Sequence, residues 1–98
     1  MNRNTAIAAL KEQAGAIRAL GATALYLFGS TRRDQALPES DLDIFLDYDR
    51  DSRFSLIQLV GIKQLLEQRL GVTVDVTTRD SLDPLLRTHI EISAERVF

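Results

Sequence analysis

The most constraining feature of this sequence is a strict alternation of side chains over residues 41–48. The segment reads DLDIFLDY, so leucine and isoleucine take every second position, and aspartate and phenylalanine take the positions between them. Successive side chains of a β-strand point to opposite faces, so the pattern predicts a strand with one apolar and one largely acidic face. Asp41 and Asp43 would lie about 7 Å apart on the acidic face. The apolar face must pack against other elements of the fold.

The N-terminal part of the chain predicts one helix followed by one strand. Apolar residues recur at spacings of three and four over residues 4–20, which is typical of an amphipathic helix. Asn4 or Thr5 can cap its start. The uncharged run over residues 22–28 predicts a buried strand that ends at Gly29. The polar segment that follows predicts one helical turn and then a loop.

The C-terminal part predicts a long helix, a third strand and a final helix. Residues 52–70 are amphipathic, and the residues we expect on the buried side are Leu56, Leu59, Val60, Leu66 and Leu70. Residues 72–78 alternate as a strand. Asp83 followed by Pro84 is typical of a helix N-cap with proline at the first helical position, and this helix would run to about Ile92. The order of elements predicts an α/β architecture, with a three- or four-stranded sheet covered by helices.

Length and composition indicate an ordinary soluble protein. The 98 residues suffice for a single domain, which we expect to span residues 1–98. The formal net charge is −2, which gives no electrostatic basis for stable direct binding of nucleic acid. The absence of cysteine excludes disulfides and thiolate zinc sites. The longest uncharged stretch, residues 19–31, is shorter than the roughly 20 apolar residues of a membrane span. We therefore expect no membrane association and a cytoplasmic location.

Three aspartates form a candidate site. Asp41 and Asp43 share one strand face, and Asp75 lies on the polar face of the 72–78 strand. If the two strands are neighbours, the three carboxylates converge, and their repulsion requires a compensating cation. Mg²⁺ prefers such oxygen ligands, and two ions about 4 Å apart can assist an in-line phosphoryl displacement. The alternative is that the aspartates are solvent-facing residues of an amphipathic strand, as we expect for Asp47.

The turn after the first strand is a candidate anion site. Glycine at position 29 lets the backbone approach a ligand closely, because no Cβ blocks the way. The amides of the turn and the Ser30 hydroxyl would then bind a triphosphate. Taken alone, a Gly-Ser pair after a strand is more often an ordinary turn.

The two candidate sites together carry a resemblance to a known family. Gly29-Ser30, ten further residues and then Asp41-Leu42-Asp43 form a G-S-x10-D-x-D arrangement. With a later aspartate, this pattern resembles the signature of the DNA polymerase beta-like nucleotidyltransferase superfamily. The segment LFGSTRRDQALPESDLDIFLDYD is especially similar to the minimal nucleotidyltransferase (MNT) family. The resemblance covers most of the chain and implies an α+β core, a mixed sheet flanked by about four helices.

The resemblance also implies a role for each residue of the motif. Gly29 and Ser30 would bind the β- and γ-phosphates of ATP. Asp41 and Asp43 would ligate two Mg²⁺ ions. Asp75 would complete the second metal position and help to deprotonate the incoming hydroxyl.

Other polar residues are less constrained. Arg32 and Arg33 lie where their side chains can reach a bound triphosphate, for which the arginine fork is well suited. Alternatively, either arginine is solvated or pairs with Asp34 or Glu39. The single histidine, His89, is expected on the surface of the last helix or in packing, without a catalytic role.

The resemblance implies a partner as well. MNT proteins are characteristically paired with small helical HEPN proteins as toxin–antitoxin modules, so the chain would be an antitoxin of a type VII-like module. It would transfer AMP from ATP to a tyrosine of a HEPN ribonuclease toxin. Two alternatives stay open: an antitoxin that neutralises its partner by binding alone, and a transferase acting on RNA or a small molecule. The lack of an acceptor-binding domain argues against the second.

Overall fold

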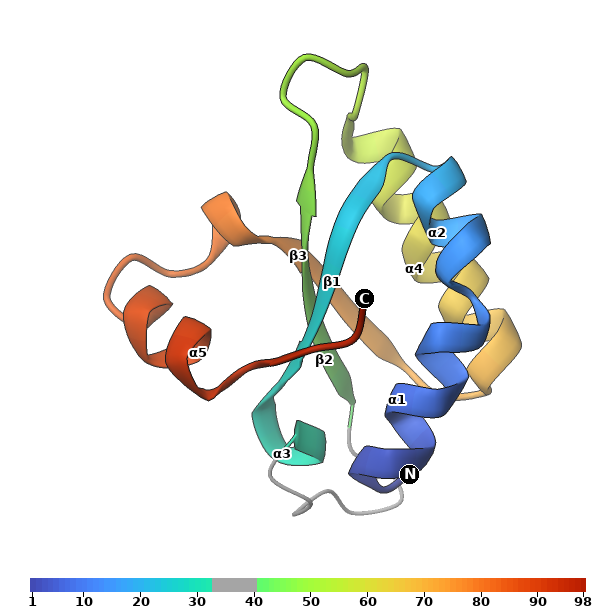
Figure 1. The fold of residues 1–98 in the computed structure, drawn as a ribbon, viewed down its shortest axis with the longest axis vertical. Coiled ribbons are helices and arrows are strands. Elements are labelled where there is room, and N and C mark those ends of the chain that lie inside the picture. Colours follow the sequence, from blue (N-terminus) through green and yellow to red (C-terminus); the bar gives the residue numbers. More distant parts are fainter. Residues whose placement is uncertain (33–40) are drawn as a thin grey trace.

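The computed structural model describes residues 1–32 and 41–98, which form a four-stranded mixed sheet in an α+β fold (Figure 1). The strands are β1 (Ala22–Phe28), β2 (Leu42–Tyr48), β3 (Val74–Thr78) and β4 (Glu95–Arg96). They lie in the order β3-β2-β1-β4. β1 is antiparallel to both β2 and β4, whereas β2 and β3 are parallel. The predicted mixed sheet is therefore confirmed.

Helices cover one face of this sheet. The helical segments of the described residues are α1 (Arg3–Glu12), α2 (Ala14–Ala19), α3 (Gly29–Arg32), α4 (Leu56–Leu70), the 3₁₀ turn η1 (Arg79–Ser81) and α5 (Arg87–Ser93). Figure 1 shows α1, α2 and α4 along the same side of the strands. The buried core lies between them and the sheet, and it includes the alternating apolar residues Leu42, Ile44 and Leu46 of β2. Within the described ranges, no helix has the length and apolar character to cross a membrane.

The N-terminal helical segment differs from the single helix that its periodicity predicts. It is divided at Gln13, whose backbone (φ −95°, ψ 5°) departs from helical geometry and whose N–H donates to Leu10 O at 3.1 Å. The N-cap is Asn2, whose side chain accepts a hydrogen bond from Thr5 N at 2.8 Å. The prediction of Asn4 or Thr5 as the cap was therefore wrong.

The long helix α4 begins later and faces the core differently than its sequence predicts. Ser55 caps it in a capping box, so the preceding residues are turn and coil. Leu56 is 73% exposed and Val60 is also exposed, whereas Ile62 and Leu66 are fully buried. Apolar residues surround the first half of this helix on several sides, and periodicity alone cannot choose which side faces the sheet.

The end of the chain also differs from the prediction. Asp83 and Pro84 do not start the final helix, because the Asp83 side chain accepts from Leu85 N at 3.0 Å and its carbonyl accepts from Leu86 N at 2.9 Å. These bonds close a turn, and α5 begins only at Arg87. The residues after α5, for which the sequence predicts no element, form β4 along the edge of β1.

Side chains of α4 cap the outer edge of β3. Val74 N–H donates to Glu67 Oε2 at 3.0 Å, and Val74 O accepts a hydrogen bond from Lys63 Nζ. Lys63 and Glu67 also pair with each other at 3.1 Å. The Val74 N–H, followed by the Lys63 ammonium, holds the pKa of Glu67 below its ordinary value. This clamp fixes β3 against α4, and with it the position of the neighbouring Asp75.

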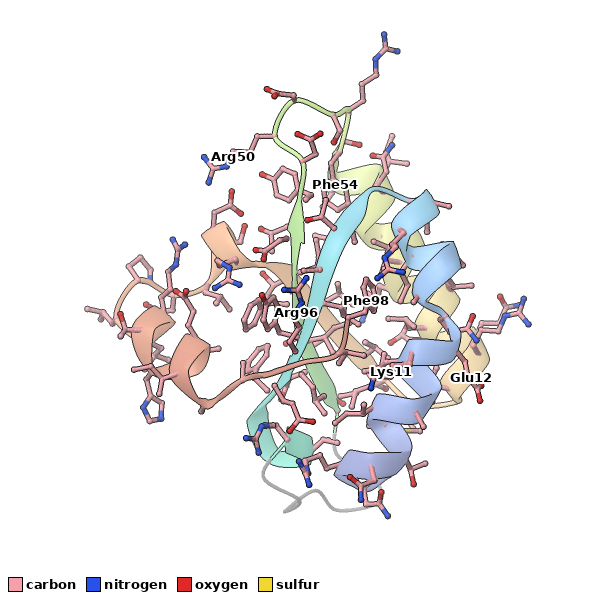
Figure 2. The ribbon with its side chains drawn as sticks, viewed as in Figure 1. Lys11, Glu12, Arg50, Phe54, Arg96 and Phe98 are labelled. Atoms are coloured by element: carbon pink, nitrogen blue, oxygen red, sulfur yellow. The ribbon has the colours of Figure 1, made fainter. Side chains whose placement is uncertain are left out.

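We expect Glu67→Gln to lower the free energy of unfolding at neutral pH. Because the pKa of Glu67 is lowered on folding, its stabilising effect is complete above the ordinary value of 4.5 and is lost as pH falls through the lower folded value. Urea denaturation should therefore show a gap between wild type and variant that narrows toward about pH 3. Glu12→Gln, at an exposed position labelled in Figure 2, is the control and should show no such gap. A gap independent of pH would contradict the clamp.

Candidate active site

The site forms on the face of the sheet that α1, α2 and α4 leave uncovered. Leu42 and Ile44 point into the core, so Asp43 between them points to the opposite face. In the pairing register, Asp43 lies beside Phe28 of β1 on one side and beside Asp75 of β3 on the other. Adjacent strands are about 4.8 Å apart. The expectation that the two acidic strands are neighbours is confirmed, and the register aligns Asp43 with Asp75.

The Gly29 turn packs directly against Asp43. Gly29 has φ +76°, a left-handed conformation that favours glycine. A Cβ at this position would overlap the Asp43 carboxylate and lie 3.2 Å from the Asp43 Cβ. Gly29 is also the first residue of the single turn α3, in which Thr31 is buried. A helical N–H group donates to the carbonyl oxygen four residues earlier. The first N–H groups of such a turn therefore have no acceptor within the turn.

The structure describes the other predicted site residues only in part. Asp41 is exposed and lies immediately before Leu42, the first residue of β2. Arg33 and the side chain of Ser30 lie outside the described residues. Across residues 1–32 and 41–98, no three Asp, Glu or His side chains are grouped closely enough to hold a metal ion. The described backbone thus brings Asp43, Asp75 and the Gly29 turn together, and the metal site stays a prediction.

Arg32 faces β4 from the end of α3. Its Nε lies 3.6 Å from Glu95 Oε1, and this buried nitrogen has no hydrogen-bond partner among the described residues. Glu95 also binds Arg3 of α1 at 2.8 Å. Glu95 therefore ties α1 and α3 to β4 and keeps the Arg32 guanidinium next to the Gly29 turn. The alternative partners considered above, Asp34 and Glu39, lie outside the described residues.

An aromatic cluster occupies the next row of the same sheet face. Tyr26 and Phe45, paired across β1 and β2, stack with ring centroids 4.7 Å apart. Phe28 packs on Phe45 at 5.7 Å. The Arg79 guanidinium covers the first two rings at 4.8 and 5.1 Å. Arg96, labelled in Figure 2, lies 6.0 Å from the Tyr26 ring. The cluster lies in the row next to the acidic pair, and its central ring, Phe45, is fully buried.

Arg79 also holds α5 to this face. It donates to Asp47 at 2.8 and 3.1 Å and to Glu91 of α5 at 2.7 Å, and Arg87 binds the other Glu91 oxygen at 2.8 Å. The Asp47 carboxylate, followed by Glu91, raises the pKa of Arg79 against the opposing effect of burial. The expectation that Asp47 is solvated was wrong. No local pattern signals this contact, because Arg79 and Asp47 are 32 residues apart.

We expect Arg79→Met to lower stability by about 1–2 kcal/mol and to loosen α5. Methionine keeps apolar contact with Tyr26 and Phe45 but loses every ion pair. Amide exchange at Ile90, within α5, should accelerate more than exchange in β1. Arg69→Met, at an exposed position near the end of α4, is the control. Equal acceleration at both places would show that Arg79 stabilises the whole protein and has no particular effect on α5.

Comparison with known proteins places this geometry in a family. The model of the nucleotidyltransferase domain matches residues 10–97. A candidate protein adenylyltransferase of Methanocaldococcus jannaschii is 41% identical over 64 residues, which are 65% of this chain and 67% of the relative. The solved structure of a candidate minimal nucleotidyltransferase superposes with a TM-score of 0.82 and 29% identity, covering 97% of this chain and 95% of that one.

A third similarity concerns the fold alone. The complex of a tri-AMPylated HEPN toxin with an MNT antitoxin from Shewanella oneidensis contains a chain that matches with a TM-score of 0.63. Its identity is 19%, and the match covers 90% of this chain and 68% of that chain. The family match, in contrast, includes the Gly29 turn and both paired aspartates. The sequence signature, the mixed sheet and this match agree, and the chain therefore belongs to the nucleotidyltransferase family.

Proposed function

We propose that this protein transfers AMP from ATP to a hydroxyl of a partner protein and thereby acts as the antitoxin of a HEPN toxin. The observation that carries the proposal is the alignment of Asp43 with Asp75, with the Gly29 turn packed against Asp43. This places a candidate phosphate-binding turn beside candidate metal ligands. The relative named as a candidate protein adenylyltransferase supports the activity. The fold shared with a chain of the HEPN–MNT complex supports the partner.

The chemistry of the donor set fits Mg²⁺. Asp41, Asp43 and Asp75 offer carboxylate oxygens, which hard divalent ions prefer. The acidic pair lies on the sheet face that the core helices leave uncovered, where substrate phosphates can supply further ligands. When bound, two Mg²⁺ ions would stabilise the attacking and the leaving oxygens of the displacement.

The protein groups have separate roles in the proposed reaction. Backbone N–H groups of the turn that begins at Gly29 bind the β- and γ-phosphates and orient the leaving group. The acceptor oxygen attacks the α-phosphorus, and the bond from this phosphorus to the oxygen bridging to the β-phosphate breaks, so pyrophosphate leaves. Asp75 takes the proton of the acceptor hydroxyl. Arg32, kept near the turn by Glu95, adds positive charge for the departing pyrophosphate.

Mass spectrometry of the partner tests this proposal. A purified HEPN toxin, taken as the candidate acceptor, is incubated with the wild type, ATP and Mg²⁺. We expect AMP units on a tyrosine, and we expect no modification when ATP or Mg²⁺ is omitted. An unmodified partner under complete conditions would overturn the proposal, as would label on RNA without any protein acceptor.

A double substitution separates transfer from neutralisation by binding alone. Asp41→Asn with Asp43→Asn removes two candidate metal ligands without changing side-chain size. We expect this variant to bind the toxin but to leave cells expressing the toxin unprotected. Full protection by the variant would show that binding alone neutralises the toxin.

A further inference from the structure

Three large apolar side chains flank or belong to α5 and are exposed. Leu85 is 91% exposed, Ile92 is 80% exposed, and Leu86 is about half exposed. The helix itself contains no buried residue. Core packing therefore does not explain why these positions are apolar. Leu85 and Leu86 directly precede α5 and Ile92 lies near its end, and exposed apolar residues grouped in one short segment are typical of an interaction surface.

The position of α5 relates this surface to the candidate active site. Through Glu91 it is tied to Arg79, which lies on the aromatic row next to the row of Asp43 and Asp75. After the C-terminal end of α5, Glu95 contacts Arg32, which lies next to the Gly29 turn. Figure 1 shows α5 projecting from the body on the side away from α1, α2 and α4. An acceptor that approaches the uncovered sheet face would therefore meet α5.

The charges on this segment favour a protein over a nucleic acid. The guanidinium groups of Arg79 and Arg87 are both paired with Glu91, and Arg79 is also paired with Asp47. The exposed acid Asp83 lies beside Leu85. An apolar surface whose neighbouring cations are already neutralised does not attract phosphates. It is complementary to an apolar patch on a protein.

We propose that Leu85, Leu86 and Ile92 form the docking surface for the acceptor protein, called here the α5 apolar surface. This proposal rests on the proposed function, because that function requires an acceptor protein and the surface is where the acceptor would bind. Docking there holds the acceptor next to the uncovered sheet face, so that one of its hydroxyl groups can reach the acidic pair. The ion pairs of Arg79 position the surface relative to the carboxylates.

A second exposed apolar group gives a matched control. Leu56 and Ile57 are exposed to a similar degree at the start of α4. They belong to the helical layer that covers the other face of the sheet (Figure 1). A partner bound there would be separated from the acidic pair by the sheet itself. Substitution at both places changes surface polarity equally, with little effect on the core.

The test compares Leu85→Glu/Ile92→Glu with Leu56→Glu/Ile57→Glu, using as acceptor the same HEPN toxin as in the mass-spectrometry experiment. For the α5 variant we expect KM for the acceptor to rise about tenfold or more. Its kcat and its affinity for a fluorescent ATP analogue should stay within about twofold of wild type. The α4 variant should match wild type throughout. An unchanged KM in the α5 variant, or a larger rise in the α4 variant, would overturn the proposal.

Binding measured without ATP separates failure of this proposal from failure of the proposed function. If the wild type binds the acceptor but transfers no AMP, the proposed function fails, and weaker binding by the α5 variant alone still supports docking. If the wild type transfers AMP and both variants bind equally well, the docking surface is wrong and the function stands. A wild type that neither binds nor modifies the acceptor overturns both.

Discussion

Replacing Asp43 with asparagine is expected to reduce AMP transfer by about 1,000-fold or more, with the fold intact. Asp43 is the carboxylate that contacts the Gly29 turn and lies beside Asp75. Asparagine has nearly the same shape but lacks the negative charge that holds a divalent ion. Since like charges facing each other across paired strands destabilise a sheet, the melting temperature should stay equal or rise slightly. Single-turnover assays and thermal unfolding measure the two effects.

Asp51→Asn is the control for this loss of charge. Asp51 is an exposed residue in the turn between β2 and α4. Its substitution changes the net charge by the same amount, so it should leave both activity and stability unchanged. If Asp43→Asn retained more than about a tenth of wild-type activity, Asp43 would not be a ligand of a required metal.

Gly29→Ala should impair both stability and catalysis. The φ of +76° makes alanine unfavourable by about 1–2 kcal/mol. The added methyl group also overlaps the Asp43 carboxylate, which must then move. A displacement of about 1 Å in a catalytic group can cost about 100-fold in rate, and we expect a loss of at least that size. Urea denaturation and transfer assays measure the two effects separately.

Gly71→Ala separates backbone strain from the steric overlap. Gly71 ends α4 with φ +71°, and a Cβ there would meet no atom within 4 Å. This variant should lose stability to a similar degree but keep its catalytic rate. Equal rate losses in the two variants would mean that strain or partial unfolding, and not the contact with Asp43, explains the effect at Gly29.

The sequence predicts well those features that depend on local patterns. The strand β1 follows from an uncharged apolar run and β2 from its alternation, and the faces predicted for Ile44 and Asp43 are confirmed. Gly21 and Gly71 each follow a helix, where a left-handed glycine is common, and both have positive φ. The pairing of Asp43 with Asp75 required one further assumption, that their strands are neighbours, and the register confirms it.

Features that depend on contacts between distant segments were not predicted. β4 is only two residues long and carries no strand periodicity, so its pairing with β1 leaves no trace in the sequence. The ion pairs of Arg79 join three elements, and none of its partners lies within a helical turn of it. In α4, Leu56 and Ile62 are equally apolar, and only the packed sheet determines which is buried.

The clamp on β3 limits how this protein can recruit another chain. An edge strand with unpaired N–H and C=O groups is a template for added strands and for aggregation. At Val74 those groups are already bonded to Glu67 and Lys63, and the other edge of the described sheet is the very short β4. The β3 edge is thus blocked to an added strand at Val74, and the opposite edge offers only a short template for β-augmentation. We therefore expect a partner to bind this protein through side-chain surfaces and to dissociate without disturbing the sheet.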